Sequence, residues 1–342
     1  MTERSHLMDG LRVLAAHLIV LHHLVTNGPL GQTLQPLWPG LFQLLHDHGR
    51  YATQVFLVMA GYLSAVALLG PQPPSVVRNI GKRYARLMPA YLLAILMVAL
   101  VVTCLRPWIN QDWLTEPPTL QQWLSHALLI QSLIDQPAMT VGAWYVAIDF
   151  QLFVVLNVLV WGLLRLGFKQ GSVLISLAVL CLASQWVFNR NPDGDVWALY
   201  FFESYGLGAV LAYAMHDPRG NVPARGVLLL CMCSAVVAGL IYPRPRLLIS
   251  VAVCALLWWG VYRWRPPAAL SRWLQRQSDA SYSLFVTHFI PLVVANAVWI
   301  SWDGQSTAWG VMWLLVTWGM CVGWSVIFYH SVETLTRKAW RH

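Results

Sequence analysis

Residues 8–27 read MDGLRVLAAHLIVLHHLVTN, an apolar run with an arginine near its start and histidines toward its end. About 20 predominantly apolar residues are enough for a helix to cross a bilayer. The Thr26-Asn27-Gly28-Pro29 sequence that closes the run has no Ala-x-Ala-like cleavage site, which argues against a cleaved signal peptide. We therefore expect residues 8–27 to be a retained first membrane span.

The composition of the whole chain is typical of a membrane protein. Of 342 residues, 58% are hydrophobic and 11% are charged, and the mean hydropathy is +0.56. A soluble protein is about one quarter charged, and a disordered chain is poor in apolar residues. Both classes are therefore excluded. The net charge of +8 is first a matter of topology in a membrane protein, so membrane lipids are expected partners and nucleic acid is not.

Ten apolar runs bounded by charge, Pro or Gly predict the fold. They indicate an all-α, polytopic membrane protein with about ten transmembrane helices, forming one domain over residues 1–342 with apolar spans over roughly 8–331. The runs are 8–27, 51–70, 84–104, 142–165, 171–188, 196–215, 225–242, 247–262, 279–300 and 307–331. Residues 105–141 are the longest hydrophilic segment, and within it 119–135 is a candidate interfacial helix.

Lys and Arg are unevenly shared between the two sides that this layout defines. Seventeen of the 22 fall on the side of the N-terminus. The other five are Arg50, Arg106, Arg190, Arg244 and Arg246. Because Lys and Arg are enriched in cytoplasmic loops, both termini are predicted to be cytoplasmic, with an even number of spans.

The first run holds two polar residues in a suggestive spacing. Arg12 and His23 are eleven residues apart, which puts them on one helix face about 16 Å apart. A guanidinium could hold the anionic part of a long donor there, and an imidazole could act deeper as general base or nucleophile. Asp9, three residues before Arg12, could orient it. The alternative makes Arg12 an interfacial anchor and His23 a helix-packing residue.

Other ionisable groups lie inside later apolar runs. Asp149 and Gln151 fall in 142–165, and a carboxylate in such a place requires a cationic or imidazole partner. Asp149 could orient a catalytic histidine or form a buried ion pair between helices. Glu203 and His288 pose the same alternative.

A basic stretch precedes the third run. Its members recur at three- and four-residue spacing and are Arg78, Lys82, Arg83 and Arg86. Such a helical face suits the phosphates of a nucleotide-based donor and equally suits lipid headgroups.

Five motifs in this order resemble the integral-membrane acyltransferase-3 family of bacterial acyltransferases. They are Asp9-Gly10-Leu11-Arg12 with His23, Phe56-Leu57-Val58-Met59-Ala60-Gly61-Tyr62, Arg78 through Pro89 and Tyr91, Trp144 with Asp149, Gln151 and Phe153, and Ser281-Tyr282-Ser283-Leu284-Phe285-Val286-Thr287-His288. Ala60, Tyr62 and Asp149 replace the Ser, Phe and Glu that are usual in the family.

The resemblance implies transfer of an acyl group, most often acetyl, from a cytoplasmic acyl-CoA to a hydroxyl of an envelope carbohydrate or glycolipid at the bacterial inner membrane. It implies His23 and Asp149 as catalytic residues, with His23 as base or transient acyl carrier. The donor-binding residues would be Arg12, Arg78, Arg83 and Arg86. Supporting residues would be Asp9, Tyr91, Trp144, Gln151 and His288, and Glu203 is a further supporting candidate from its place inside an apolar run. Acyl-CoA is then a co-substrate, with no permanently bound cofactor and no metal.

Two other functions fit some of the same residues. A secondary transporter could use Arg12, His23, Asp149 and Glu203 as an ion or anion path, although the sequence has no matched broken helices in two halves. Haem ligation by histidines has no further signature; the candidates are His17, His22, His23 and His288. The six cysteines lie in apolar runs and predict neither a disulfide framework nor a zinc site. No motif specifies the oligomeric state.

Overall fold

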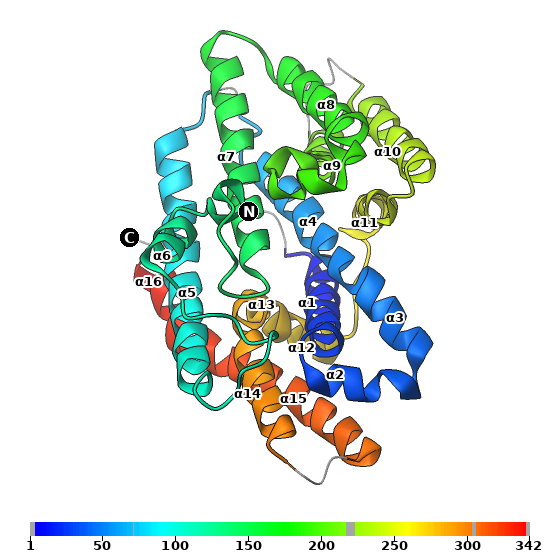
Figure 1. Cartoon of the computed structure of the whole chain (residues 1–342). Coiled ribbons are helices and arrows are strands. Elements are labelled where there is room, and N and C mark those ends of the chain that lie inside the picture. The colour runs from blue at the N-terminus through cyan, green and yellow to red at the C-terminus, as the bar shows by residue number, and fades with distance from the viewer. Residues whose placement is uncertain (1–3, 71, 217–222, 303–305, 340–342) are drawn as a thin grey trace. The chain divides into compact units, whose positions relative to one another are not determined.

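The computed structural model describes residues 4–70, 72–216, 223–302 and 306–339. Within these ranges the regular secondary structure is helical, with no strand, which confirms the all-α prediction (Figure 1). Arg219 and Arg341, both counted in the charge asymmetry, lie outside the described residues.

Each of the ten predicted runs contains a helix. The helices are α1 (His6–Thr26), α4 (Thr53–Val66), α5 (Val76–Leu105), α7 (Ala143–Arg165), α8 (Gln170–Trp186), α9 (Ala198–His216), α10 (Ala224–Ile241), α11 (Pro245–Gly260), the pair α13 (Ser281–Thr287) and α14 (Phe289–Ile300), and α15 (Thr307–Phe328). Among the described residues, six helical stretches are long and apolar enough to cross a membrane, and the bent pair α13–α14 makes a seventh. The count of ten spans and the cytoplasmic termini stay predictions.

Short helices occupy the connections between these elements and follow the last of them. They are α2 (Pro29–Leu34), η1 (Gln35–Leu37), α3 (Pro39–His48), η2 (Gly49–Ala52), α6 (Leu120–Ala127), η3 (Gln131–Ile134), η4 (Phe188–Arg190), η5 (Pro192–Val196), α12 (Ala268–Asp279), the π-helical turn η6 (Tyr329–Glu333) and α16 (Thr334–Ala339). The segment 119–135 does contain a helix, α6. It starts at a capping box in which Thr119 and Gln122 bond each other's backbone amides.

The chain forms two compact units, each built from three separate stretches of sequence. The first unit comprises Met1–Met8, Thr53–Tyr84 and Tyr145–Pro266, and the second comprises Asp9–Ala52, Ala85–Trp144 and Pro267–His342. The stretches of the two units alternate along the chain, so neither unit is one continuous segment. The division therefore does not test the prediction of a single domain over 1–342.

The first unit is a helix bundle around α9. Helices α4, α8, α10 and α11 pack on α9, whose residues are buried from Tyr200 to Tyr213 (Figure 1). Helices α4 and α9 approach closely because each presents a glycine to the other. A Cβ added at Gly61 would lie 1.9 Å from the carbonyl oxygen of Tyr205, and one at Gly208 would lie 1.9 Å from that of Val58. Small residues at helix contacts are a common packing device in membrane proteins.

This contact predicts a strong effect of Gly61→Ala. The added methyl group meets rigid backbone rather than a movable side chain, so the helices must separate. We expect the free energy of unfolding to fall by about 2–3 kcal/mol. Thermal unfolding in detergent measures this, with Gly162→Ala on α7 as the matched control, since no atom lies within 4 Å of a Cβ built there. Equal stability of the two variants would contradict the close approach.

In the second unit α2, α3 and α14 supply the residues of a small apolar core, and α15 packs against it. That core contains Leu30, Leu34, Phe42 and Trp299. The predicted run 279–300 is broken in the structure: α13 and α14 are bent by 43° at His288. The physical reason is Pro291, which lacks the amide hydrogen that a continuous helix would donate to the carbonyl of Thr287. The break puts His288 at the corner of two helices.

Candidate active site

His23 lies in the last turn of α1, where a neighbouring amide fixes its ring. Its Nδ1 is 2.9 Å from Oδ1 of Asn27. An amide oxygen can only accept a hydrogen bond, so Nδ1 of His23 carries the proton and donates. In the neutral ring the lone pair is then on Nε2, which is the arrangement required of a general base or a nucleophile.

His288 stacks on His23. The ring centroids are 5.2 Å apart and the planes are inclined by 20°. Nδ1 of His288 donates to the carbonyls of Leu284 and Phe285 at 3.1 and 2.9 Å. Nε2 of His288 is buried and has no hydrogen-bond partner among the described residues. The structure thus brings together two predicted site residues that are 265 positions apart in sequence, each with Nδ1 committed as a donor.

The turn after α1 is closed by Asn296 from α14. The side-chain amide of Asn296 donates to the carbonyl of Asn27 at 3.1 Å, and its Oδ1 accepts from the backbone amide of Leu30 at 3.0 Å. Between them Gly28 has φ +104°, and a Cβ there would lie 2.5 Å from the Asn296 amide. Only glycine fits both the left-handed backbone and the available space.

The other histidines of α1 have different environments. His22 is buried, and its Nδ1 bonds the carbonyl of Leu45 at 2.8 Å. Nε1 of Trp318 donates to Nδ1 of His17 at 3.2 Å. In the described parts of the chain, no three His, Cys, Asp or Glu residues are grouped so as to hold a metal ion. His17 thus contacts Trp318 on α15, whereas the ring of His22 lies edge-on to that of His23, with centroids 4.8 Å apart.

Arg12 and Asp9 share α1 with His23. The helix runs without interruption from His6 to Thr26, so the eleven-residue spacing does put Arg12 and His23 on one face of a single helix. Asp9 is buried and Arg12 is half-buried.

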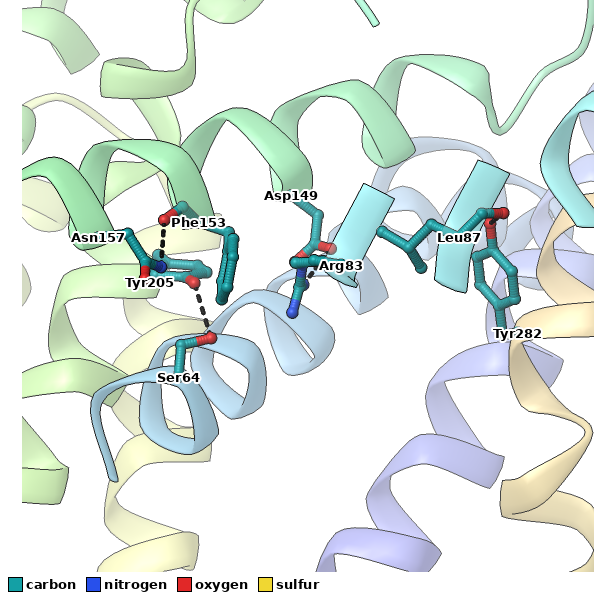
Figure 2. Close-up of polar contacts among 8 residues, drawn as sticks. All are labelled: Ser64, Arg83, Leu87, Asp149, Phe153, Asn157, Tyr205 and Tyr282. Carbon is teal, nitrogen blue, oxygen red and sulfur yellow. Dashed lines mark hydrogen bonds and ion pairs between the residues drawn. The ribbon is translucent and has the colours of Figure 1, made fainter. Parts of the chain in front are cut away.

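The basic stretch lies on the first turns of α5, which begins eight residues before the predicted run. Arg78, Lys82 and Arg86 are exposed. Arg83 differs, because its Nη2 lies 2.5 Å from Oδ2 of Asp149 on α7 and its guanidinium lies 4.5 Å from the centre of the Phe153 ring (Figure 2). The four basic residues are therefore not equivalent.

The ion pair between Arg83 and Asp149 is largely buried. The two side chains are 24% and 11% exposed. Nε of Arg83 and Oδ1 of Asp149 are buried and have no hydrogen-bond partner in the part of the chain that the structure describes. Nε of Arg83 is therefore a buried donor, and Oδ1 of Asp149 a buried acceptor, that the ion pair itself does not use.

Two predicted supporting residues have further informative contacts. Tyr91 is 1% exposed, and its hydroxyl has no hydrogen-bond partner among the described residues. Glu203 accepts from the hydroxyl of Ser204 at 2.8 Å, and that hydroxyl also contacts Gln54 at 2.6 Å and Ser250 at 2.7 Å. Glu203 thus belongs to a buried polar network inside the first unit.

The remaining motif residues lie on α7 and α13. Trp144 and Gln151 are half-buried on α7. The hydroxyl of Tyr282, from the last motif, donates to the carbonyl of Leu87 at 3.0 Å (Figure 2).

Sequence reasoning missed two residues of the histidine site, Asn27 and Asn296. The spacing of His23 and Asn27 was a usable signal, because residues four apart on a helix are neighbours. Asn296 had no such signal, since its partners lie 266 and 269 positions away in sequence.

Membrane-length helices, a bent helix and a stacked histidine pair define a multi-pass membrane protein with a candidate catalytic centre. A family model described as an acyltransferase domain, Acyl_transf_3, matches residues 6–330. The chain therefore belongs to the acyltransferase-3 family, which confirms the resemblance of its five motifs and favours an acyltransferase over a transporter. No curated protein and no solved structure gave a match.

Proposed function

We propose that the protein transfers an acyl group, most often acetyl, from a cytoplasmic acyl-CoA to a hydroxyl of an envelope carbohydrate or glycolipid. Family membership supports acyl transfer in general. The observation that carries the residue assignment is the Nδ1 contact of His23 with Asn27, which leaves the Nε2 lone pair for chemistry. The proposed location is the bacterial inner membrane.

His23 can serve either of two routes. In the direct route, Nε2 removes the proton from the acceptor hydroxyl as its oxygen attacks the thioester carbonyl. The carbon–sulfur bond then breaks and coenzyme A leaves, protonated by the imidazolium. In the stepwise route, Nε2 attacks the carbonyl, the carbon–sulfur bond breaks and coenzyme A leaves as the thiolate. The acceptor hydroxyl then attacks the acyl-imidazolium, the carbon–nitrogen bond breaks, and the hydroxyl proton passes to the freed Nε2 and from there to the thiolate.

The donor assignments rest on charge and position. Arg12 is proposed to hold the donor, because its guanidinium shares one helix face with His23. Arg78 and Arg86 are exposed on α5 and are proposed to bind the phosphates of coenzyme A. Arg83 and Asp149 are kept as donor-binding and catalytic residues respectively, since each has a buried polar atom without a hydrogen-bond partner among the described residues.

Binding of acetyl-CoA to the detergent-purified protein tests the proposal. We expect saturable binding that free coenzyme A competes for. Arg12→Ala should raise the dissociation constant about 10- to 100-fold, because a hydrogen bond to a charged group contributes about 1.5–3 kcal/mol. Arg165→Ala, an exposed arginine at the end of α7, is the matched control and should leave binding unchanged. Folded protein that binds no acetyl-CoA would contradict the proposed donor.

A further inference from the structure

Asn27 and Asn296 bond to the same short piece of chain beside His23. Asn27 directly follows α1, and its side chain points back to the imidazole four residues earlier. Asn296 bonds the chain on both sides of Gly28, at the carbonyl of Asn27 and the amide of Leu30. Neither asparagine takes part in the bond-making and bond-breaking steps proposed above.

We propose that Asn27 is a positioning residue that holds His23 with Nδ1 protonated and Nε2 available as the base, and that Asn296 holds Asn27 in place. The inference rests on the proposed function, because it presupposes that His23 performs the chemistry.

The first step of the argument is the tautomer. A neutral imidazole can carry its proton on either nitrogen, and the hydrogen bond made by one nitrogen decides which. Oδ1 of Asn27, 2.9 Å from Nδ1, stabilises the form protonated at Nδ1. The same bond limits rotation of the ring, and a catalytic group that is misplaced by about 1 Å can lose about 100-fold in rate.

The second step is the rigidity of the turn that carries Asn27. The amide nitrogen of Asn296 donates to the carbonyls of Asn27 and Leu292 at 3.1 and 3.0 Å, while its oxygen accepts from Leu30. Asn296 is 2% exposed, so these bonds are shielded from water. The turn packs closely against Asn296, because a Cβ at Gly28 would lie only 2.5 Å from its side chain.

His288 adds a third constraint. It lies on the same bent helix pair as Asn296, eight residues earlier, and its ring covers one face of His23. One element therefore supports both the turn that carries Asn27 and the ring that Asn27 orients.

The test compares Asn27→Leu with Asn27→Asp by initial rates with acetyl-CoA as donor. Leucine has similar size but accepts no hydrogen bond, so we expect kcat to fall about 10- to 100-fold with the KM for acetyl-CoA changed less than about twofold. Aspartate still accepts from Nδ1, so Asn27→Asp should stay within about threefold of the wild-type kcat. Asn157→Leu is the control for loss of an asparagine away from the histidines, because Asn157 is buried in the first unit, where its side chain bonds to Phe153 and Asn79. It should leave kcat unchanged.

A spectroscopic readout separates positioning from folding. Nitrogen-15 NMR of histidine-labelled protein, assigned with His23→Ala, should show His23 protonated at Nδ1 in the wild type. If Asn27→Leu does not fold, this spectrum and the kcat of Asn27→Asp still decide the matter. A proton on Nε2, or a kcat of Asn27→Asp as low as that of His23→Ala, would overturn the inference.

The two levels of the argument fail differently. An inactive wild-type protein would overturn the proposed function. An active wild type with an inactive His23→Ala and a normal kcat in folded Asn27→Leu would overturn only the role of Asn27.

Discussion

Replacing His23 by alanine is expected to lower acyl transfer about 10²- to 10⁴-fold, the range over which a positioned general base contributes to catalysis. The protein should remain folded, because the ring is half-buried and its hydrogen bond is to a residue of the same turn. The measurement is transfer of labelled acetyl from acetyl-CoA to envelope carbohydrate in membrane vesicles. Acetyl-CoA binding by the same variant should remain saturable, since Arg12 is unchanged.

His17→Ala is the matched control for this experiment. His17 lies on the same helix, is half-buried, and contacts Trp318 rather than the histidine pair. It should keep transfer within a few-fold of the wild type. Normal transfer by a folded His23→Ala protein would remove His23 from the mechanism. Incubation with labelled donor in the absence of acceptor separates the two routes, because only the stepwise route leaves label on the protein.

The helices were predictable because long apolar runs bounded by Pro, Gly or charge have few other solutions in a bilayer. All ten runs contain helices, and α1 joins Arg12 to His23 as their spacing indicates. The bend at His288 had a visible cause in Pro291, three residues further on. The start of α5 was less predictable, because its first turns are polar and carry no apolar pattern. They are helical because they extend the helix of the apolar run that follows them.

The sequence pointed to several residues of the candidate site, but it did not show which of them contact each other. The preference of a buried carboxylate for a cation indicated a partner for Asp149, and the structure identifies it as Arg83, 66 positions earlier. No local spacing relates residues that far apart. The same holds for the stacking of His288 on His23 and for the contacts of Asn296, all of which depend on tertiary packing.

Removal of one partner of the Arg83–Asp149 pair is expected to destabilise the protein by about 4 kcal/mol, because breaking a buried ion pair leaves an uncompensated charge. The relevant variant is Asp149→Leu, which leaves the guanidinium of Arg83 over the Phe153 ring without its carboxylate. Thermal unfolding in detergent measures the loss. Asp149→Glu, the residue usual in the family, keeps the charge and should cost less than about 1.5 kcal/mol.

The double variant Arg83→Leu/Asp149→Leu separates stability from catalysis. Replacing both charges by apolar side chains is often neutral or stabilising, so it should recover most of the stability lost in Asp149→Leu. If Arg83 or Asp149 acts in the reaction, this stable variant still transfers acyl groups at least about tenfold more slowly than the wild type. Recovery of both stability and transfer would make the pair purely structural, and a double variant as unstable as Asp149→Leu would show that the two charges are not coupled.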